Sequence, residues 1–198
     1  MRKLSTFLLF ILACHSEKLP LRRYTTADGL AGNRVEWILS DSRGFLWFAT
    51  TEGLSRFDGY EFKNFTPDQG LPGSYVTQII ETRSGSYWIG TNRGPCRFNP
   101  SQSGSRSRFT PYGIGARGAT TLMEDRSGAI WCGTFSGLFR LMKGGSTFEP
   151  VDIGMPLARG GDDAIVSALL EDRQGILWVG VRLPPRLRQT VKTQFAVR

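Results

Sequence analysis

The residue types that most often carry out catalysis are scarce in this sequence. His15 is the only histidine among 198 residues and lies close to the N-terminus, so acid–base or metal chemistry by imidazole is almost excluded for the rest of the chain. Cys96 and Cys132 have no accompanying base, and both align with strand positions of an internal repeat, which favours small buried residues over nucleophiles. We therefore expect no catalytic residue and no enzymatic activity.

Two further groups of residues resemble sites without completing one. Asp162 and Asp163 form an acidic pair in a glycine-rich loop, but a Ca²⁺ site needs more oxygen ligands at regular spacing. Gly113, Gly115 and Gly118 are not followed by a helical pattern, so the helix N-terminus that binds phosphate is missing. The sequence predicts neither a metal site nor a cofactor.

The first 17 residues have the pattern of an export signal. Arg2 and Lys3 precede the apolar stretch 7–12, and Ala13 precedes Cys14, as in a secretory leader. Residues 11–14 also resemble a bacterial lipobox, in which Cys14 becomes the lipidated first residue. An ordinary cleaved leader with an incidental cysteine, or a misassigned start, are the alternatives. We expect a periplasmic protein, or one anchored to the membrane through the leader or a lipid and facing the periplasm.

Composition excludes several classes of protein. Hydrophobic residues make up 40% of the chain and charged residues 21%, which is unlike a disordered chain. Removing the basic residues of 1–3 and of 182–198 from the net charge of +8 leaves +1 for residues 4–181, and such a neutral body argues against nucleic-acid binding. The 24 glycines and 12% aromatic residues are typical of short strands joined by tight turns, so we expect an all-β fold.

An internal repeat with the pattern D-x-x-G-x-x-W occurs four times, with Thr82 in place of the second Asp. Its tryptophans are 41, 43 and 47 residues apart, a period typical of propeller blades. We expect each Trp to pack between sheets, each Gly to adopt positive φ and each Asp to bond the backbone of its turn. The repeat residues are Asp41, Gly44, Trp47, Gly85, Trp88, Asp125, Gly128, Trp131, Asp172, Gly175 and Trp178.

One repeat predicts four antiparallel strands, the number in a propeller blade. Apolar or alternating segments separated by turns place them at 35–39, 46–50, 54–57 and 60–65. Asp58-Gly59, between the last two, favours a two-residue type I′ hairpin.

The repeats are similar to a known family. The segments Y-T-T-x-D-G-L from Tyr24, D-S-R-G-F-L-W-F from Asp41 and G-L-S-R-F-D-G from Gly53 closely resemble two-component regulator propeller repeats. The resemblance extends from about residue 21 to 98, is looser over 109–139 and stops after 181. It implies the sensor region of hybrid histidine kinases and related signalling proteins, with further blades and a membrane-spanning kinase as partners.

The repeat pattern breaks off near the C-terminus. After Val181 the chain continues with Pro184 and Pro185, which cannot donate the hydrogen bonds of a strand. We expect an incomplete ring of three blades and half of a fourth. Leu21–Tyr24 matches an outer strand whose blade is missing. Repeats are expected at about 24–65, 66–109, 110–148 and 149–181, within a partial propeller at 18–181. Residues 182–198 are expected to form a basic, disordered tail outside the pattern, as in a truncated or frameshifted product.

Propeller loops that converge at one end of the central channel are the natural place for a ligand. Two classes of function remain. The first is an exported, non-catalytic sensory module that binds an unknown small molecule or protein, and the sequence does not separate it from a plain protein-interaction module. The second is an enzyme similar to the streptogramin lyases. Their active sites rely on histidine, which this body lacks. The candidate ligand-binding residues are Asn33, Arg34, Glu52, Ser74, Tyr75, Asn92 and Arg93.

Overall fold

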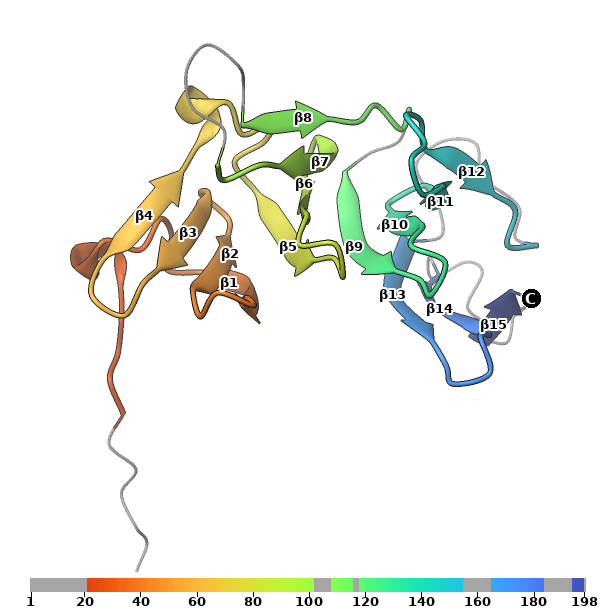
Figure 1. The fold of residues 1–198 in the computed structure, drawn as a ribbon, viewed down its shortest axis with the longest axis horizontal. Helices are drawn as coiled ribbons and strands as arrows, with labels where there is room; N and C mark the ends of the chain where they lie inside the picture. The colour runs from red at the N-terminus through yellow and green to blue at the C-terminus, as the bar shows by residue number, and fades with distance from the viewer. Residues whose placement is uncertain (1–20, 102–107, 116–117, 155–164, 184–193, 198) are drawn as a thin grey trace, which may run out of the picture.

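Four antiparallel sheets form an open arc in the computed structural model (Figure 1). The structure describes residues 21–101, 108–115, 118–154, 165–183 and 194–197. The first strand of each sheet lies on the inner side of the arc, and the fourth strands of the first three sheets lie on the outer side (Figure 1). Each sheet is one propeller blade, and the ring is not closed. Among the described residues no helix has the length and apolar character needed to span a membrane.

Each blade is a simple meander of strands. The first contains β1 (Val35–Ser40), β2 (Leu46–Thr50), β3 (Leu54–Phe57) and β4 (Phe62–Phe65); the second β5 (Val76–Glu81), β6 (Tyr87–Thr91), β7 (Gly94–Phe98) and β8 (Phe109–Pro111); the third β9 (Ala119–Glu124), β10 (Ile130–Thr134), β11 (Gly137–Leu141) and β12 (Glu149–Val151); and the fourth β13 (Ile165–Glu171), β14 (Leu177–Arg182) and β15 (Gln194–Val197). Two short 3₁₀ helices, η1 (Thr26–Asp28) and η2 (Pro67–Gln69), precede β1 and β5.

The first blade has the four predicted strands, although the last begins at Phe62 instead of Tyr60, and it lacks the predicted hairpin. A type I′ turn at Asp58-Gly59 needs positive φ at both residues, and only Gly59 has it. The loop instead spans 58–61, with the Asp58 amide donating to the Glu61 carbonyl and the Asp58 carboxylate accepting from the amides of Tyr60 and Glu61. These bonds, which the aspartate side chain accepts, account for the longer loop.

The fourth blade has one more strand than the sequence predicted. β15 comes from the tail and pairs antiparallel with β14, with Phe195 opposite Val179. The expectation of a tail without a repeat function, disordered after Val181, is therefore wrong for 194–197. The edge of β14 offers unpaired backbone groups, and the segment Gln194–Val197 is free of proline. Pro184 and Pro185 themselves lie outside the described residues, as do Asp162, Asp163 and the leader with Cys14 and His15.

The D-x-x-G-x-x-W repeat folds as a turn closed by its own aspartate. Oδ1 of Asp41 accepts the amides of Arg43 and Phe45, both at 2.9 Å, while Oδ2 accepts the indole N–H of Trp47 at 2.8 Å. Asp125 and Asp172 hold Trp131 and Trp178 in the same way. The glycine at the fourth position has a φ of 74–85° in all four turns, a conformation that favours glycine.

Hydrogen bonding to these aspartates favours their charged form. Burial opposes the ionisation of Asp41, but hydrogen bonds from Trp47, Tyr87 and two amides outweigh it and hold the pKa of the carboxyl below its ordinary value. Burial likewise opposes the ionisation of Asp125, and the bonds from Ser127 and Trp131 lower its pKa. The turns therefore carry carboxylates at neutral pH.

The first three repeat tryptophans are each buried against the blade that follows them. Trp47 is fully buried, and its ring packs on Phe65, Tyr87 and Phe98. Trp88 and Trp131 are 5% and 7% exposed. Trp178, in the last blade, is 41% exposed although its indole bonds Asp172 as the others do. Burial of this residue is therefore a measure of contact between blades.

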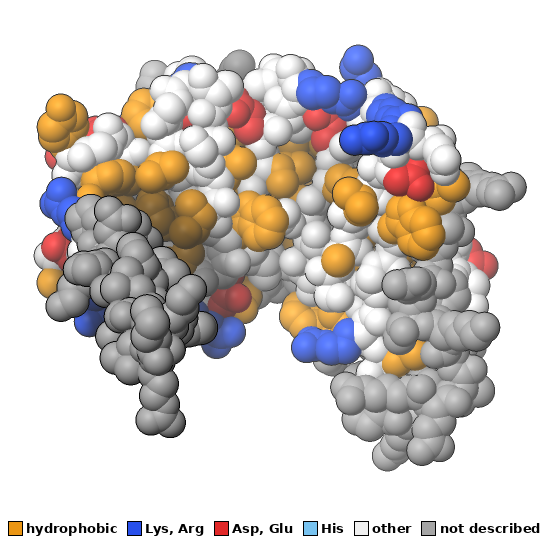
Figure 2. Space-filling model, turned by 90° about the horizontal axis from the view of Figure 1, so that it is seen from below, with side chains coloured by type: hydrophobic (Ala, Val, Ile, Leu, Met, Phe, Trp, Pro, Cys, Tyr) orange, Lys and Arg blue, Asp and Glu red, His pale blue; other side chains and the backbone are white. Residues whose placement is uncertain are grey.

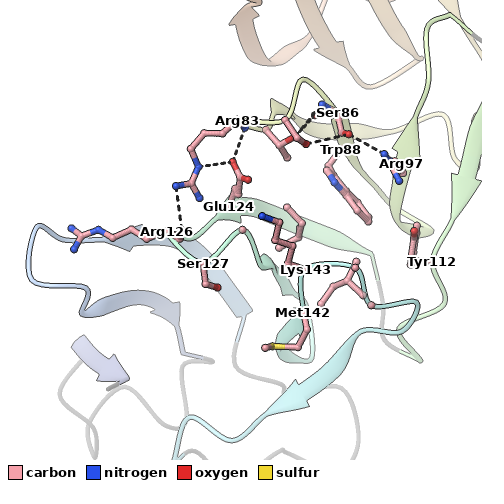
Figure 3. A pocket seen from close by; sticks show the side chains of 17 residues that line it. Arg83, Ser86, Trp88, Arg97, Tyr112, Glu124, Arg126, Ser127, Met142 and Lys143 are labelled. Atoms are coloured by element: carbon pink, nitrogen blue, oxygen red, sulfur yellow. Dashed lines mark hydrogen bonds and ion pairs between the residues drawn. The ribbon is translucent and has the colours of Figure 1, made fainter.

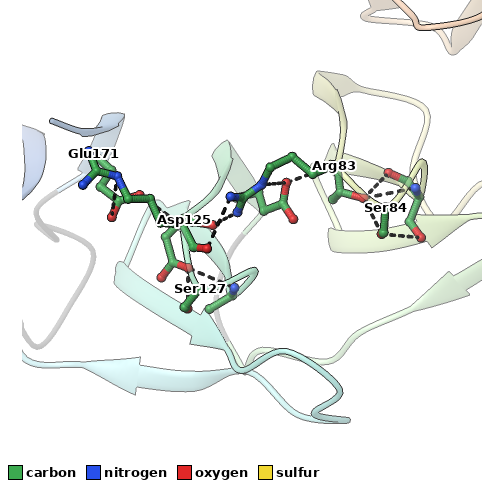
Figure 4. Close-up of polar contacts among 10 residues, drawn as sticks. Arg83, Ser84, Asp125, Ser127 and Glu171 are labelled. Atoms are coloured by element: carbon green, nitrogen blue, oxygen red, sulfur yellow. Dashed lines mark hydrogen bonds and ion pairs between the residues drawn. The ribbon is translucent and has the colours of Figure 1, made fainter. Parts of the chain in front are cut away.

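A glutamate at the end of the first strand fastens each blade to the one before it. Its carboxylate accepts a hydrogen bond from the backbone N–H of the second residue in the D-x-x-G turn of the preceding blade. Donor and acceptor therefore lie on different sheets. Figure 4 shows these contacts for the later blades, with side-chain bonds from Arg83 and Arg126 to neighbouring carbonyls. The three bonds are Ser42 to Glu81 (2.7 Å), Arg83 to Glu124 (2.8 Å) and Arg126 to Glu171 (2.7 Å).

In the segment before β1, Tyr24 packs as a residue of an outer strand does. Leu21–Tyr24 forms no strand, but the Tyr24 ring packs on Phe57 and Phe62 at 5.2 and 5.6 Å between centroids. One repeat later Phe65 packs in the same way on Phe98 and Phe109. The predicted equivalence of Tyr24 and Phe65 is therefore visible in the packing, without the blade that Leu21–Tyr24 would complete.

Candidate functional site

The seven candidate ligand-binding residues lie on two kinds of loop at one end of the blades. Asn33, Arg34, Ser74 and Tyr75 precede the first strands, and Glu52, Asn92 and Arg93 lie in the turns between the second and third strands. Backbone bonds join the two kinds of loop, from the Thr51 amide to the Arg34 carbonyl and from the Asn92 amide to the Tyr75 carbonyl. We call this end of the blades the loop face.

Two of the seven residues meet each other through a third that the sequence did not single out. Nε of Arg34 lies 2.7 Å from Oε1 of Glu36, in an ion pair whose N–H is not aligned for a hydrogen bond. Tyr75, on the next blade, has its pKa raised by burial first, then by a hydrogen bond to Glu36 and the charge of that carboxylate. Arg34, Glu36 and Tyr75 thus form one polar group across the first and second blades.

Glu36 could have been found from its register in the repeat. The equivalent positions hold Thr77 and Thr120, whose hydroxyls donate to the carbonyls of Ala119 and Val166 on the following blade. A glutamate at this position can reach the following blade in the same way while bringing a charge to the loop face. The glutamate in a position that holds threonine in the next two repeats was the signal that could have identified this residue.

Trp37 is a second residue that the sequence analysis missed. It is the fifth tryptophan, lies outside the repeat pattern and is 44% exposed. With Val35, Glu36 and Ile38 it lines a shallow hollow of about 310 Å³. Seen from below, hydrophobic side chains are exposed at several places along the arc (Figure 2). An exposed indole beside a carboxylate suits a ligand with both an apolar face and polar groups.

The other candidate residues are not brought together. The Asn33 carboxamide bonds the Thr26 backbone and side chain, so it supports η1. Glu52, Ser74 and Arg93 make no side-chain hydrogen bond or ion pair with another residue of the described segments, and neither does the Asn92 carboxamide. They are available to a ligand but do not converge on one point.

The cysteines and the acidic residues do not add a reactive centre. Cys96 and Cys132 are buried and free; burial raises the pKa of the Cys96 thiol to about 12 and that of Cys132 in the same direction, which keeps both protonated. Over the described segments no three His, Cys, Asp or Glu side chains cluster as a metal site would require. Gly113, Gly115 and Gly118 precede the strand β9.

Comparison with known families identifies the repeats. The family described as two component regulator propeller matches residues 29–52, 70–93 and 160–182. These segments include the loops before the first strands and the turns with Trp47, Trp88 and Trp178. No curated protein matches the sequence.

Solved structures share the fold at low sequence identity. The extracellular domain described as that of hybrid two component system BT3049 from B. thetaiotaomicron superposes with a TM-score of 0.67 and 20% identity, over 92% of this chain and 29% of that chain. A corresponding domain of BT4673 from the same organism gives 0.65 and 16%, over 85% and 22%. A streptogramin B lyase gives 0.57 and 19%, over 76% and 49%.

These likenesses show a propeller fold shared with much longer chains, of which this chain spans less than a third in the two-component systems. The matched segments carry the turns and inter-blade loops on which this fold depends. Three segments of the chain therefore match the two component regulator propeller repeat by sequence, and its blades share the propeller fold of these extracellular domains.

Proposed function

We propose that this chain is an exported sensory module of a two-component signalling protein, and that it binds a small molecule or a protein without transforming it. The family and the extracellular domains of similar fold support this role. The observation that carries it is the group formed by Arg34, Glu36 and Tyr75 beside the exposed Trp37. This group bridges two blades, so a ligand held there couples to their relative position.

The loop face is suited to binding more than to catalysis. Toward a ligand, Arg34 and Tyr75 can act as hydrogen-bond donors and Glu36 as an acceptor, and Trp37 offers an apolar surface. None of these side chains is a nucleophile beside a base, which acyl transfer or hydrolysis would require. The fold likeness to a streptogramin B lyase keeps an enzyme as the alternative, and the test below separates the two.

Binding at the loop face is expected to appear as a thermal shift. We expect a screen of the full chain against small polar metabolites to give a compound that raises the Tm, because a ligand at 100 times its Kd stabilises the folded state by about 2.7 kcal/mol. The double variant Arg34→Gln/Tyr75→Phe should lose this shift.

The matched control is Arg173→Gln, which removes an exposed cation from a turn at the opposite end of the blades. It should keep the shift. No stabilising compound, or a shift that survives in the double variant, contradicts binding at this group. Conversion of the compound in the presence of the chain, followed by chromatography, would favour the enzyme.

Export is tested separately through the leader. In a Gram-negative host the chain should be recovered from the cell envelope, shortened at its N-terminus. Cys14→Ser should abolish labelling by a fatty-acid probe if the lipobox is used, and Cys96→Ser serves as the control that keeps it. Full-length chain that stays in the cytoplasm would contradict export.

A further inference from the structure

The second blade differs from the others at one oxygen atom. In the other three turns Oδ1 of the aspartate accepts backbone amides and Oδ2 accepts the indole N–H of the tryptophan. Thr82 replaces the first of these oxygens, since its hydroxyl accepts the Ser86 amide at 3.0 Å. It has no second oxygen, and the carboxylate charge is lost with it. The turn therefore keeps its shape while its tryptophan loses its acceptor.

The indole of Trp88 is left with an unpaired donor in a confined place. Trp88 is 5% exposed, and its ring is held by Tyr112 and Phe148 at 4.8 and 5.8 Å. Its Nε1–H has no acceptor among the described residues, unlike the indole N–H groups of the other three repeats. This N–H is not among the fully buried atoms that lack a partner, and Trp88 lines a cleft, so an acceptor that enters the cleft can reach it.

Arg97 also lacks the carboxylate that pairs with the equivalent arginine of the third blade. It pairs in register with Trp88, as Arg140 pairs with Trp131. Arg140 reaches the carboxylate of Asp125 at 3.4 Å, whereas the only hydrogen bond of Arg97 within the described part of the chain is to the Ser86 hydroxyl at 3.0 Å. The replacement of one aspartate by Thr82 thus leaves an N–H donor and a guanidinium together without an anion.

These groups line a cleft of about 470 Å³ between the second and third blades (Figure 3). Lys143 adds a third cationic or donor group, and it forms no ion pair with any described residue. Glu124 is the one carboxylate in the lining, and Arg83 neutralises it at 3.3 Å. Tyr112, Leu141 and Met142 supply apolar surface. The cleft therefore combines a positive end with an apolar wall, as small-molecule sites do.

The neighbouring cleft shows what occupies this position when the aspartate is present. Between the third and fourth blades a cleft of about 420 Å³ is lined by Asp125, Trp131, Arg140 and Glu171 among others. There Asp125 bonds the indole, and the same carboxylate neutralises the arginine. The chain thus contains its own example of a carboxylate bound by an indole N–H and an arginine.

We propose that the cleft between the second and third blades binds a small organic anion, whose carboxylate accepts hydrogen bonds from Trp88 Nε1 and Arg97 in the place that aspartate takes in the other blades. Lys143 adds charge attraction, and the body of the ligand lies along Tyr112 and Met142. The cleft lies at the turn end of the blades, opposite the loop face, so this site is independent of the proposed sensory function there.

The test follows the indole N–H signals of the full ¹⁵N-labelled chain by NMR, using sodium acetate as the probe and sodium chloride at equal ionic strength as the reference. Of the five tryptophan signals, the one removed by Trp88→Phe should move saturably with acetate, while those of Trp47 and Trp131 stay fixed. Arg97→Gln should weaken the response roughly tenfold. Arg56→Gln, at the same register in the first blade, is the matched control and should not change it.

Thr82→Asp is the decisive variant, because it supplies the missing carboxylate within the chain. The Trp88 signal should then move downfield without acetate and stop responding to it, and unchanged Trp47 and Trp131 signals show that the variant is folded. The proposal is overturned if the Trp88 signal moves no further in acetate than in chloride, if Thr82→Asp leaves the response intact, or if sulfate binds more tightly than acetate.

Discussion

Replacing Trp47 with alanine is expected to lower the free energy of unfolding by about 3–5 kcal/mol, whereas Trp178→Ala lowers it by about 1 kcal/mol. The two residues occupy the same repeat position and donate the same indole hydrogen bond, at 2.8 Å in each case. They differ in burial, because Trp47 is fully buried and Trp178 is 41% exposed. The difference between the variants therefore measures packing between blades rather than closure of the turn.

Chemical denaturation of the full chain checks this expectation, with the slope of the transition compared between variants. Trp47→Phe serves as the control that keeps an aromatic ring and removes the N–H, and it should cost about 1–3 kcal/mol because Asp41 loses a buried partner. Equal losses for Trp47→Ala and Trp178→Ala would show that the blades do not support one another.

The sequence predicted the blades well because their determinants are local. The strands at 46–50 and 54–57 follow from apolar segments between glycine-containing turns, and the structure has the same bounds. The hydrogen bond that the Trp47 indole donates to the Asp41 carboxylate was not predicted, although both residues were singled out. It depends on how the turn directs a side chain toward a residue six positions later, which spacing alone does not reveal.

Contacts between repeats were the harder part. Glu36 meets Tyr75 only because two blades pack side by side, and β15 pairs with β14 across a segment of the chain that breaks the pattern. The consequence of Thr82 was also hidden, because a threonine in place of aspartate reads as a tolerated change until the acceptor for Trp88 is sought. The effect of a residue that departs from the repeat becomes clear only when its contacts are compared with those of the neighbouring repeats.

The two end blades of the arc are expected to cause concentration-dependent association. On the first blade Val35 and Ile38 are 37% and 56% exposed, while their counterparts Val76 and Ile79 are fully buried under the preceding blade. At the other end Leu170 and Trp178 are 62% and 41% exposed. Apolar sheet faces of this kind favour contact with another surface over contact with water.

Ile38→Lys should therefore shift the chain toward monomer in sedimentation velocity at micromolar concentrations, because a desolvated lysine in such a contact is costly. Tyr60→Lys is the matched control, since Tyr60 is an apolar residue, 94% exposed, at a hairpin tip away from both end faces. Ile38 lies on the face that a preceding blade would cover, so its substitution should reduce association while leaving the cores between the four blades intact. A chain that sediments as a monomer at every concentration, or that responds equally to Tyr60→Lys, would contradict association through the end faces.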